Sequence, residues 1–134
     1  MKFQISTDHA VRILQHLYKH RGDGLQTAMD IVNATGISYP FCIKITNQLK
    51  AAGLVKSEQG RRGGYRLGRQ GHGISFYDVV LAVEGEVHLH ECLKDGNRCT
   101  YGEHNNCRTH EYLATLQGKV IKELSSQSIV DLMS

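Results

Sequence analysis

Three cysteines and two histidines lie within twenty residues in the C-terminal third of the chain, in the segment ECLKDGNRCTYGEHNNCRTH (91–110). Glycines and a pair of asparagines interrupt this segment, which favours a loop over a helix. Cys92, Cys99, Cys107 and His110 have the spacing C-x6-C-x7-C-x2-H. Thiolates are soft ligands that select zinc or iron–sulfur clusters. The segment is therefore predicted to be a metal-binding loop.

The spacing also bears on the kind of metal. A structural zinc site usually has two cysteines separated by two to four residues, and this loop lacks that spacing. Wider spacings suit an iron–sulfur cluster better, with zinc or no metal as the alternatives. His104 is interpreted as an exposed loop histidine. Cys42 falls on the apolar stripe of a predicted helix and is interpreted as a small buried hydrophobic residue.

The composition describes an ordinary folded protein. The chain has 134 residues, of which 40% are hydrophobic and 22% charged, enough for one core and a helical appendage. No apolar run approaches the ~20 residues that a membrane helix needs, and the N-terminus does not resemble a secretory signal. Four cysteines in such a chain favour thiols or metal ligands over disulfides. We therefore expect a cytoplasmic protein that does not engage membranes.

The charge is distributed unevenly along the chain. Seven lysines and arginines stand against one acid between residues 44 and 72, whereas residues 84–111 hold six acids and three basic residues. The first of these regions would attract a polyanion such as nucleic acid, and the second would not.

Two helices are expected ahead of the basic region. The segment 5–20 has apolar residues at helical spacing, and Ser6 or Thr7 is the predicted N-cap. A second, short helix over 27–35 is predicted to be capped by Thr27. A glycine follows as the turn residue.

The clearest helix spans residues 38–52, with Ser38 at its cap and Pro40 in the first turn, where a missing N–H does no harm. One face forms a buried stripe, and the other carries polar side chains suited to phosphates and base edges. Two helices joined by a glycine-containing turn, the second with such a face, predict a helix-turn-helix.

Short strands over 54–57 and 65–67, around the turn EQGRRGG, predict a basic wing beside this helix. Arginines at its tip would enter a minor groove or contact a phosphate. The predicted DNA-binding residues are Ser38, Tyr39, Lys44, Asn47, Gln48, Arg61, Arg62 and Tyr65.

A fourth helix capped by Ser75 and a last helix from Arg108 to Leu124 complete the chain. The apolar stripe of the last helix needs another surface to cover it, and a second copy of the chain is the attractive partner. The predicted fold class is mainly α with a small β-hairpin. It divides into a winged helix-turn-helix domain (1–83), a cysteine-rich loop (84–107) and a dimerisation helix with a C-terminal segment (108–134).

Several blocks together resemble the Rrf2 family of winged-helix regulators, the bacterial group that contains IscR, NsrR and RirA. They are DHAVRIL, IKITNQLKAAGLVKSEQGRRGGYRL, DVVLAVEG, the cysteine loop with CRTHEYLATL, and SIVDLM. The resemblance covers essentially the whole chain in order. It implies a homodimeric transcription factor that binds a double-stranded DNA operator, with its long helices paired and, in sensing members, an iron–sulfur cluster in the loop.

The resemblance assigns Cys92, Cys99 and Cys107 as cluster ligands. The C-x2-H ending resembles the IscR branch, in which the histidine, here His110, is the fourth ligand. The opening TDHA instead resembles the NsrR branch, in which the equivalent of Asp8 reaches the cluster of the other subunit. Asp8 is equally well explained as a favourable acid in the first turn of a helix. The cysteine spacings are longer than those usual in IscR and NsrR, so both [2Fe-2S] and [4Fe-4S] stay open.

The sequence therefore predicts a transcriptional regulator, expected to be a repressor, whose cluster responds to redox state, nitric oxide or iron–sulfur status. The alternative is a regulator of the same fold without a cluster, switched by thiol oxidation or by a partner protein, as in some family members. A remote alternative is a small zinc enzyme, which would leave the helix-turn-helix and wing unexplained. We expect no enzymatic activity and no small-molecule substrate.

Overall fold

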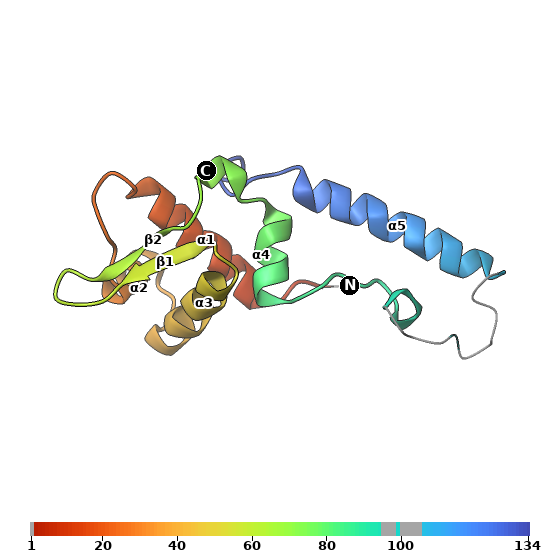
Figure 1. Cartoon of the computed structure of the whole chain (residues 1–134), viewed down its shortest axis with the longest axis horizontal. Coiled ribbons are helices and arrows are strands. Elements are labelled where there is room, and N and C mark those ends of the chain that lie inside the picture. Colours follow the sequence, from red (N-terminus) through yellow and green to blue (C-terminus); the bar gives the residue numbers. More distant parts are fainter. Residues whose placement is uncertain (1, 95–98, 100–105) are drawn as a thin grey trace.

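The computed structural model describes residues 2–94, 99 and 106–134. The described part is mainly helical with one two-stranded antiparallel sheet, which confirms the predicted fold class (Figure 1). None of its helices is long and apolar enough to cross a membrane. In chain order the elements are α1 (Ile5–Lys19), α2 (Ala28–Thr35), α3 (Tyr39–Ala51), β1 (Val55–Glu58), β2 (Gly64–Leu67), η1 (Gly71–Gly73), α4 (Phe76–Val83), η2 (Glu91–Leu93) and α5 (Arg108–Ser125).

The start of α1 differs from the prediction. Its N-cap is Gln4, so the expectation that Ser6 or Thr7 caps this helix is wrong. Thr7 is buried, and its hydroxyl donates a hydrogen bond to the carboxylate of Glu84 at the end of α4. Glu84 also accepts the N–H of Gln4 (3.3 Å). A contact between residues far apart in the chain therefore fixes where this helix begins.

The helix-turn-helix follows local rules more closely. Thr27 caps α2 as expected, because its hydroxyl accepts the N–H of Asp30 (3.1 Å) and the Asp30 carboxylate accepts the N–H of Thr27 (2.9 Å). This capping box satisfies two backbone donors that a helix end leaves open. Gly36 then takes a left-handed conformation (φ 75°), and α3 starts after Ser38 with a proline in its first turn.

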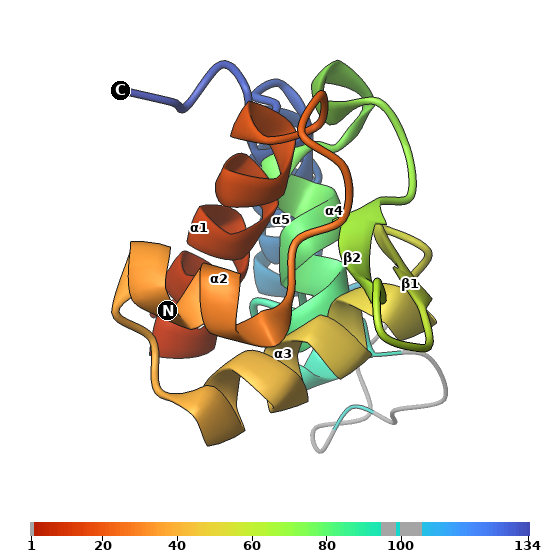
Figure 2. The ribbon, with the colours of Figure 1, turned by 90° about the vertical axis from the view of Figure 1, so that its left-hand side faces the viewer.

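The wing is a short antiparallel hairpin in which β1 and β2 pair from Val55 opposite Leu67 to Glu58 opposite Gly64. Strand β2 is hydrogen-bonded to the loop between α1 and α2. The N–H of Gln26 donates to the carbonyl of Tyr65 (3.0 Å), and the N–H of Tyr65 donates to the carbonyl of Gln26 (2.7 Å). The hairpin lies beside α3, so the two predicted DNA-contacting elements are neighbours (Figure 2).

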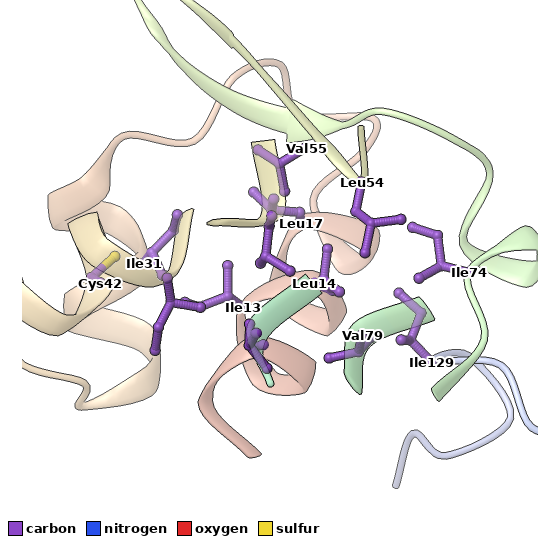
Figure 3. Packing of buried hydrophobic residues seen from close by; sticks show 14 of the residues in the cluster. Ile13, Leu14, Leu17, Ile31, Cys42, Leu54, Val55, Ile74, Val79 and Ile129 are labelled. Carbon is purple, nitrogen blue, oxygen red and sulfur yellow. The ribbon is translucent and has the colours of Figure 1, made fainter. Parts of the chain in front are cut away.

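One apolar core holds these elements together (Figure 3). It includes Cys42, which is fully buried as expected for a small hydrophobic residue on the inner stripe of α3. Burial raises the pKa of the Cys42 thiol, which keeps this cysteine protonated. The other core residues come from α1, α2, α3, β1, α4 and the segments beside them: Ala10, Ile13, Leu14, Leu17, Ile31, Ile37, Ile45, Leu49, Leu54, Val55, Ile74, Val79, Val83 and Ile129.

The C-terminal segment returns to the core after α5. Ile129 is fully buried and lies near Ile74 and Val79 (Figure 3). Its N–H donates to the carbonyl of Ile74 (2.9 Å), and the N–H of Phe76 donates to the carbonyl of Gln127 (2.8 Å). In the predicted division this segment goes with the dimerisation helix, whereas the structure packs part of it into the winged-helix core. The end of α5 is thereby attached to the DNA-binding unit.

Candidate metal centre and nucleic-acid interface

Two of the predicted cysteine ligands meet His110 at the start of α5. Cys107 is the N-cap of this helix, and its Sγ accepts the backbone N–H of His110 (3.4 Å). The Nδ1 of His110 lies 3.4 Å from the Sγ of Cys92, which belongs to the short turn η2. Two cysteine sulfurs, which are soft ligands, and one imidazole therefore gather where η2 approaches α5.

The segment before Cys92 is fastened along α5. The N–H of Leu89 donates to the side-chain carbonyl of Gln117 in the middle of that helix (2.9 Å). The N–H of Cys92 donates to Nδ1 of His90 (3.2 Å). The first bond joins the segment to α5 and the second caps η2, which itself contacts α5, so the position of Cys92 is linked to that helix.

The third cysteine, Cys99, is half-buried, but most of the loop around it lies outside the described residues, and so does His104. Within the described part of the chain, no three His, Cys, Asp or Glu side chains are arranged to hold a metal ion. The donor types at Cys92, Cys107 and His110 nevertheless fit an iron–sulfur cluster or zinc, and Cys99 would add a further thiolate.

Asp8, the other predicted fourth ligand, lies in the first turn of α1. Its carboxylate forms an ion pair with Arg12 (2.9 Å), and both side chains are largely exposed. Among the described residues it has no hydrogen bond or ion pair with the cysteine loop of its own chain. This position suits either an acid that stabilises the helix start or a ligand offered to another subunit.

The polar face of α3 carries the predicted DNA-contacting residues. Tyr39 is half exposed (51%), and Ser38, Lys44 and Asn47 are also exposed. Gln48 is only half-buried rather than exposed, and its side-chain oxygen is buried without a hydrogen-bond partner among the described residues. Four of these five side chains are therefore open to a ligand.

The wing presents two more predicted residues at its tip. Arg61 and Arg62 are exposed, and neither forms a hydrogen bond or ion pair with another described residue. Tyr65 is different, because its half-buried side chain packs against the core beneath the hairpin. Its position favours a structural role over contact with DNA.

Sequence reasoning overlooked three exposed side chains near this surface. Lys56 and Arg66 are cross-strand partners on the outer face of the wing, and strand alternation was the signal for them. Phe41 is exposed in the first half of α3, and its ring lies edge-on to the ring of His9 in α1 (centroids 6.2 Å apart). This contact joins α3 to the helix that carries Asp8.

The longest helix, α5, has no buried residue. Figure 1 shows it extending away from the body of the protein. Tyr112 on this helix is 66% exposed. The apolar stripe of α5 is only partly covered. It consists of Leu113, Leu116, Val120 and Leu124.

Comparison with known proteins places this arrangement among transcriptional regulators. The model of the Rrf2 family, described as an iron-dependent transcriptional regulator, matches residues 3–134. The HTH-type transcriptional regulator IscR of Vibrio parahaemolyticus is 30% identical over 134 residues, which cover 100% of this chain and 78% of that protein. The regulator NsrR of Shouchella clausii is 29% identical over 92% of this chain and 88% of its own length. Protein aau3 of Rhizobium meliloti is 36% identical over 72% of this chain, which spans 62% of that relative.

Solved structures agree on the fold. CymR, the global cysteine regulator of B. subtilis, superposes with a TM-score of 0.76 at 26% identity, with 98% of this chain and 95% of CymR covered. IscR of T. potens superposes with a TM-score of 0.70 at 24% identity, with 98% of this chain and 85% of that chain covered.

Proposed function

The chain belongs to the Rrf2 family of transcriptional regulators, and we propose that it is a homodimer whose affinity for a DNA operator is set by an iron–sulfur cluster in the cysteine loop. The observation that carries this proposal is the gathering of Cys92, Cys107 and His110 at the start of α5. A centre held there would act directly on the helix that protrudes from the DNA-binding unit.

The DNA-binding half of the proposal rests on α3 and the wing. An exposed polar helix face beside two unpaired arginines matches the way winged helices place one element in a major groove and another on the adjacent backbone. Lys44 and Asn47 are the side chains expected to reach base edges. Arg61 and Arg62 are expected to contact phosphates or the minor groove.

The homodimer is supported by the exposure of α5. A long helix with a half-covered apolar stripe and no buried residue gains little from its own chain, because most helical stability in proteins comes from packing an apolar face. Pairing the α5 helices of two copies would cover Leu116 and Val120 and place two recognition helices on two half-sites. In this reading residues 1–83 read DNA, 84–107 hold the cluster and 108–134 pair the subunits.

The chain's own residues provide a route from the loop to DNA. Cys107 caps α5, and His110 occupies its first turn, so a change in what these side chains bind alters the start of the helix. The far end of α5 is tied to the core through Ile129. When bound, an iron–sulfur cluster would supply a centre that oxidants, nitric oxide or iron shortage alter. A coupling of ~1–3 kcal/mol between loop and operator is enough for regulation.

A second candidate keeps the fold but dispenses with the cluster. His110 Nδ1 lies 3.4 Å from the Cys92 sulfur, and Cys107 sits at a helix N-terminus. Cysteine thiols can be oxidised reversibly, and oxidation of Cys107 would alter the cap of α5. Relatives of this fold include CymR, of which an oxidized form from Staphylococcus aureus has been solved. Thiol oxidation in the loop would then replace cluster loss as the signal.

The deciding experiment is anaerobic purification followed by an absorption spectrum, with iron, acid-labile sulfide and zinc quantified on the same sample. Visible charge-transfer bands with matching iron and sulfide are expected, and they should disappear in Cys92→Ser. The matched control is Cys42→Ala, which removes a cysteine from the core and should leave the iron content unchanged. Stoichiometric zinc without sulfide, or a colourless protein that reconstitution leaves colourless, would refute the cluster.

The fourth ligand is tested in the same assay. If His110 is the ligand, His110→Ala should lower the retained iron while Asp8→Ala does not, and the reverse is expected for Asp8. Because Asp8 would reach the cluster of the other subunit, iron retention by the unaltered chain should then depend on protein concentration, and Asp8→Ala should remove that dependence.

A further inference from the structure

A cavity of about 450 Å³ lies at the base of the wing, between the end of α1 and the outgoing end of β2. Part of its lining is apolar, and three arginines supply its charge. Among the described residues that line it there is no aspartate or glutamate. The apolar lining residues are Leu17, Leu25 and Leu67, and the arginines are Arg21, Arg66 and Arg69.

Two glycines in the lining of this cavity lie so close to neighbouring atoms that they leave no room for a side chain. A Cβ atom on the lining residue Gly71 would lie 2.5 Å from the ring of Tyr18. A Cβ on Gly68 would collide with the carbonyl oxygen of Gly53. A side chain at Gly71 would push this part of the lining away from α1, and one at Gly68 would push it away from the turn at Gly53, so both glycines allow the lining to pack closely.

Two of the three arginines, Arg21 and Arg66, have no carboxylate partner among the described residues, and the third, Arg69, has one. The side chain of Arg66 forms no hydrogen bond or ion pair with another described residue. Arg21 lies over the ring of Tyr18 (3.9 Å to its centroid) and donates to the Tyr18 carbonyl (2.7 Å), so no carboxylate neutralises it. Arg69 makes a long contact with Asp78 (3.3 Å), whose carboxylate also accepts the N–H of Ser75 (2.9 Å).

We propose that this cavity binds a small organic anion that carries at least two negatively charged groups, with its carbon skeleton on the leucines. Guanidinium groups pair with carboxylates and phosphates through two parallel hydrogen bonds. The volume falls within the ~300–1,000 Å³ of ordinary ligand sites. An apolar lining suits a carbon skeleton and not a phosphodiester chain. The cavity is lined by the outgoing end of β2 and the segment after it, whereas Arg61 and Arg62 lie in the turn between the two strands.

The site would connect two parts of the fold. Arg21 belongs to the turn after α1, and Arg66 and Arg69 belong to the wing and the segment that follows it. An anion that bridges them would fasten the wing to α1. If the chain binds an operator as proposed, fastening the wing in this way would make operator affinity depend on the anion. This inference rests on the proposed function, although binding of the anion itself requires no DNA.

The test is isothermal titration calorimetry of the full chain with citrate and, separately, 2,3-bisphosphoglycerate, each at constant ionic strength and without DNA. Saturable binding of at least one probe is expected, and which one binds tells whether carboxylates or phosphates are preferred. Arg66→Ala should weaken it about tenfold or more, since one charged hydrogen-bonding partner is lost. This variant removes no side-chain hydrogen bond or ion pair among the described residues, so the fold should persist.

The matched control is Arg61→Ala, which removes the same charge from the wing tip, outside the cavity. It should bind the probe as the unaltered chain does. Three results would overturn the proposal: no saturable heat with either probe, equal weakening by both variants, or weakening of DNA binding alone by Arg66→Ala. Because the titration contains no DNA, a failure here is distinguishable from a failure of the proposed regulatory function.

Discussion

The clearest quantitative consequence of the proposed DNA interface concerns Arg62→Ala at the wing tip. Arg62 is exposed and has no hydrogen bond or ion pair with another described residue. The tip is shaped by its backbone, because the N–H of Gly63 donates to the carbonyl of Gly60 (2.9 Å) and Gly60 has a φ of 106°. Removing the arginine should therefore leave the fold intact and delete one phosphate contact per wing.

The magnitude follows from counterion release. Each phosphate contact contributes ~0.9 to the slope of log affinity against log salt concentration. A homodimer has two wings, so the slope should become shallower by about 1.8. Across a fourfold rise in salt, the ratio of unaltered to variant affinity should then shrink by roughly tenfold.

The assay is fluorescence anisotropy on a duplex recovered by selection from randomised DNA, titrated at several salt concentrations. Lys122→Ala is the matched control, since it removes one exposed positive charge per chain from α5 and should keep the original slope. The iron content of both variants should equal that of the unaltered protein. Parallel salt lines for Arg62→Ala and the unaltered chain would refute a phosphate contact by the wing tip.

Three further outcomes test other parts of the account. Leu116→Arg should yield monomers in light scattering with unchanged helix content, and a persistent dimer would remove α5 from the interface. Ile129→Ala should lower the free energy of unfolding by ~2–5 kcal/mol in urea, because a fully buried side chain is truncated. Leu132→Ala, at a 43% exposed position, should lower that free energy far less. Equal losses would refute the anchoring role of Ile129. Hydrogen bonds from the backbone and side chain of Thr27 lower the pKa of Asp30 below 3.8, so its stabilisation is present above that value and is lost as pH falls through the lowered pKa. The thermal stability of Asp30→Asn should therefore approach that of the unaltered chain in acid, and a constant difference across pH would contradict this.

Elements governed by neighbouring residues could be predicted from the sequence. The capping box of α2 needs only Thr27 and Asp30, and α5 begins at Arg108 as its apolar spacing indicates. The start of α1 could not be predicted in this way, because Thr7 donates to Glu84, 77 residues away. The burial of Ile129 likewise depends on pairing with Ile74, a contact that no local pattern signals.

The same distinction holds at the candidate sites. The neighbouring positions of Cys107 and His110 follow from one helical turn, and their spacing suffices to predict it. The contact of His110 with Cys92 spans 18 residues and becomes visible only in three dimensions. Tyr65 was assigned to DNA from its place in the wing, but strand alternation turns its side chain toward the core and leaves Arg66 outside.

The central claim is that the state of the cysteine loop sets operator affinity, and one measurement addresses it most directly. A single anaerobic preparation is divided, one half is freed of iron, and the affinity of both halves for the selected duplex is measured at one salt concentration. The account predicts a difference of about 5- to 150-fold, as expected for a coupling of ~1–3 kcal/mol, with Cys92→Ser fixed at the iron-free value under both treatments. Equal affinities for the loaded and iron-free halves would contradict it.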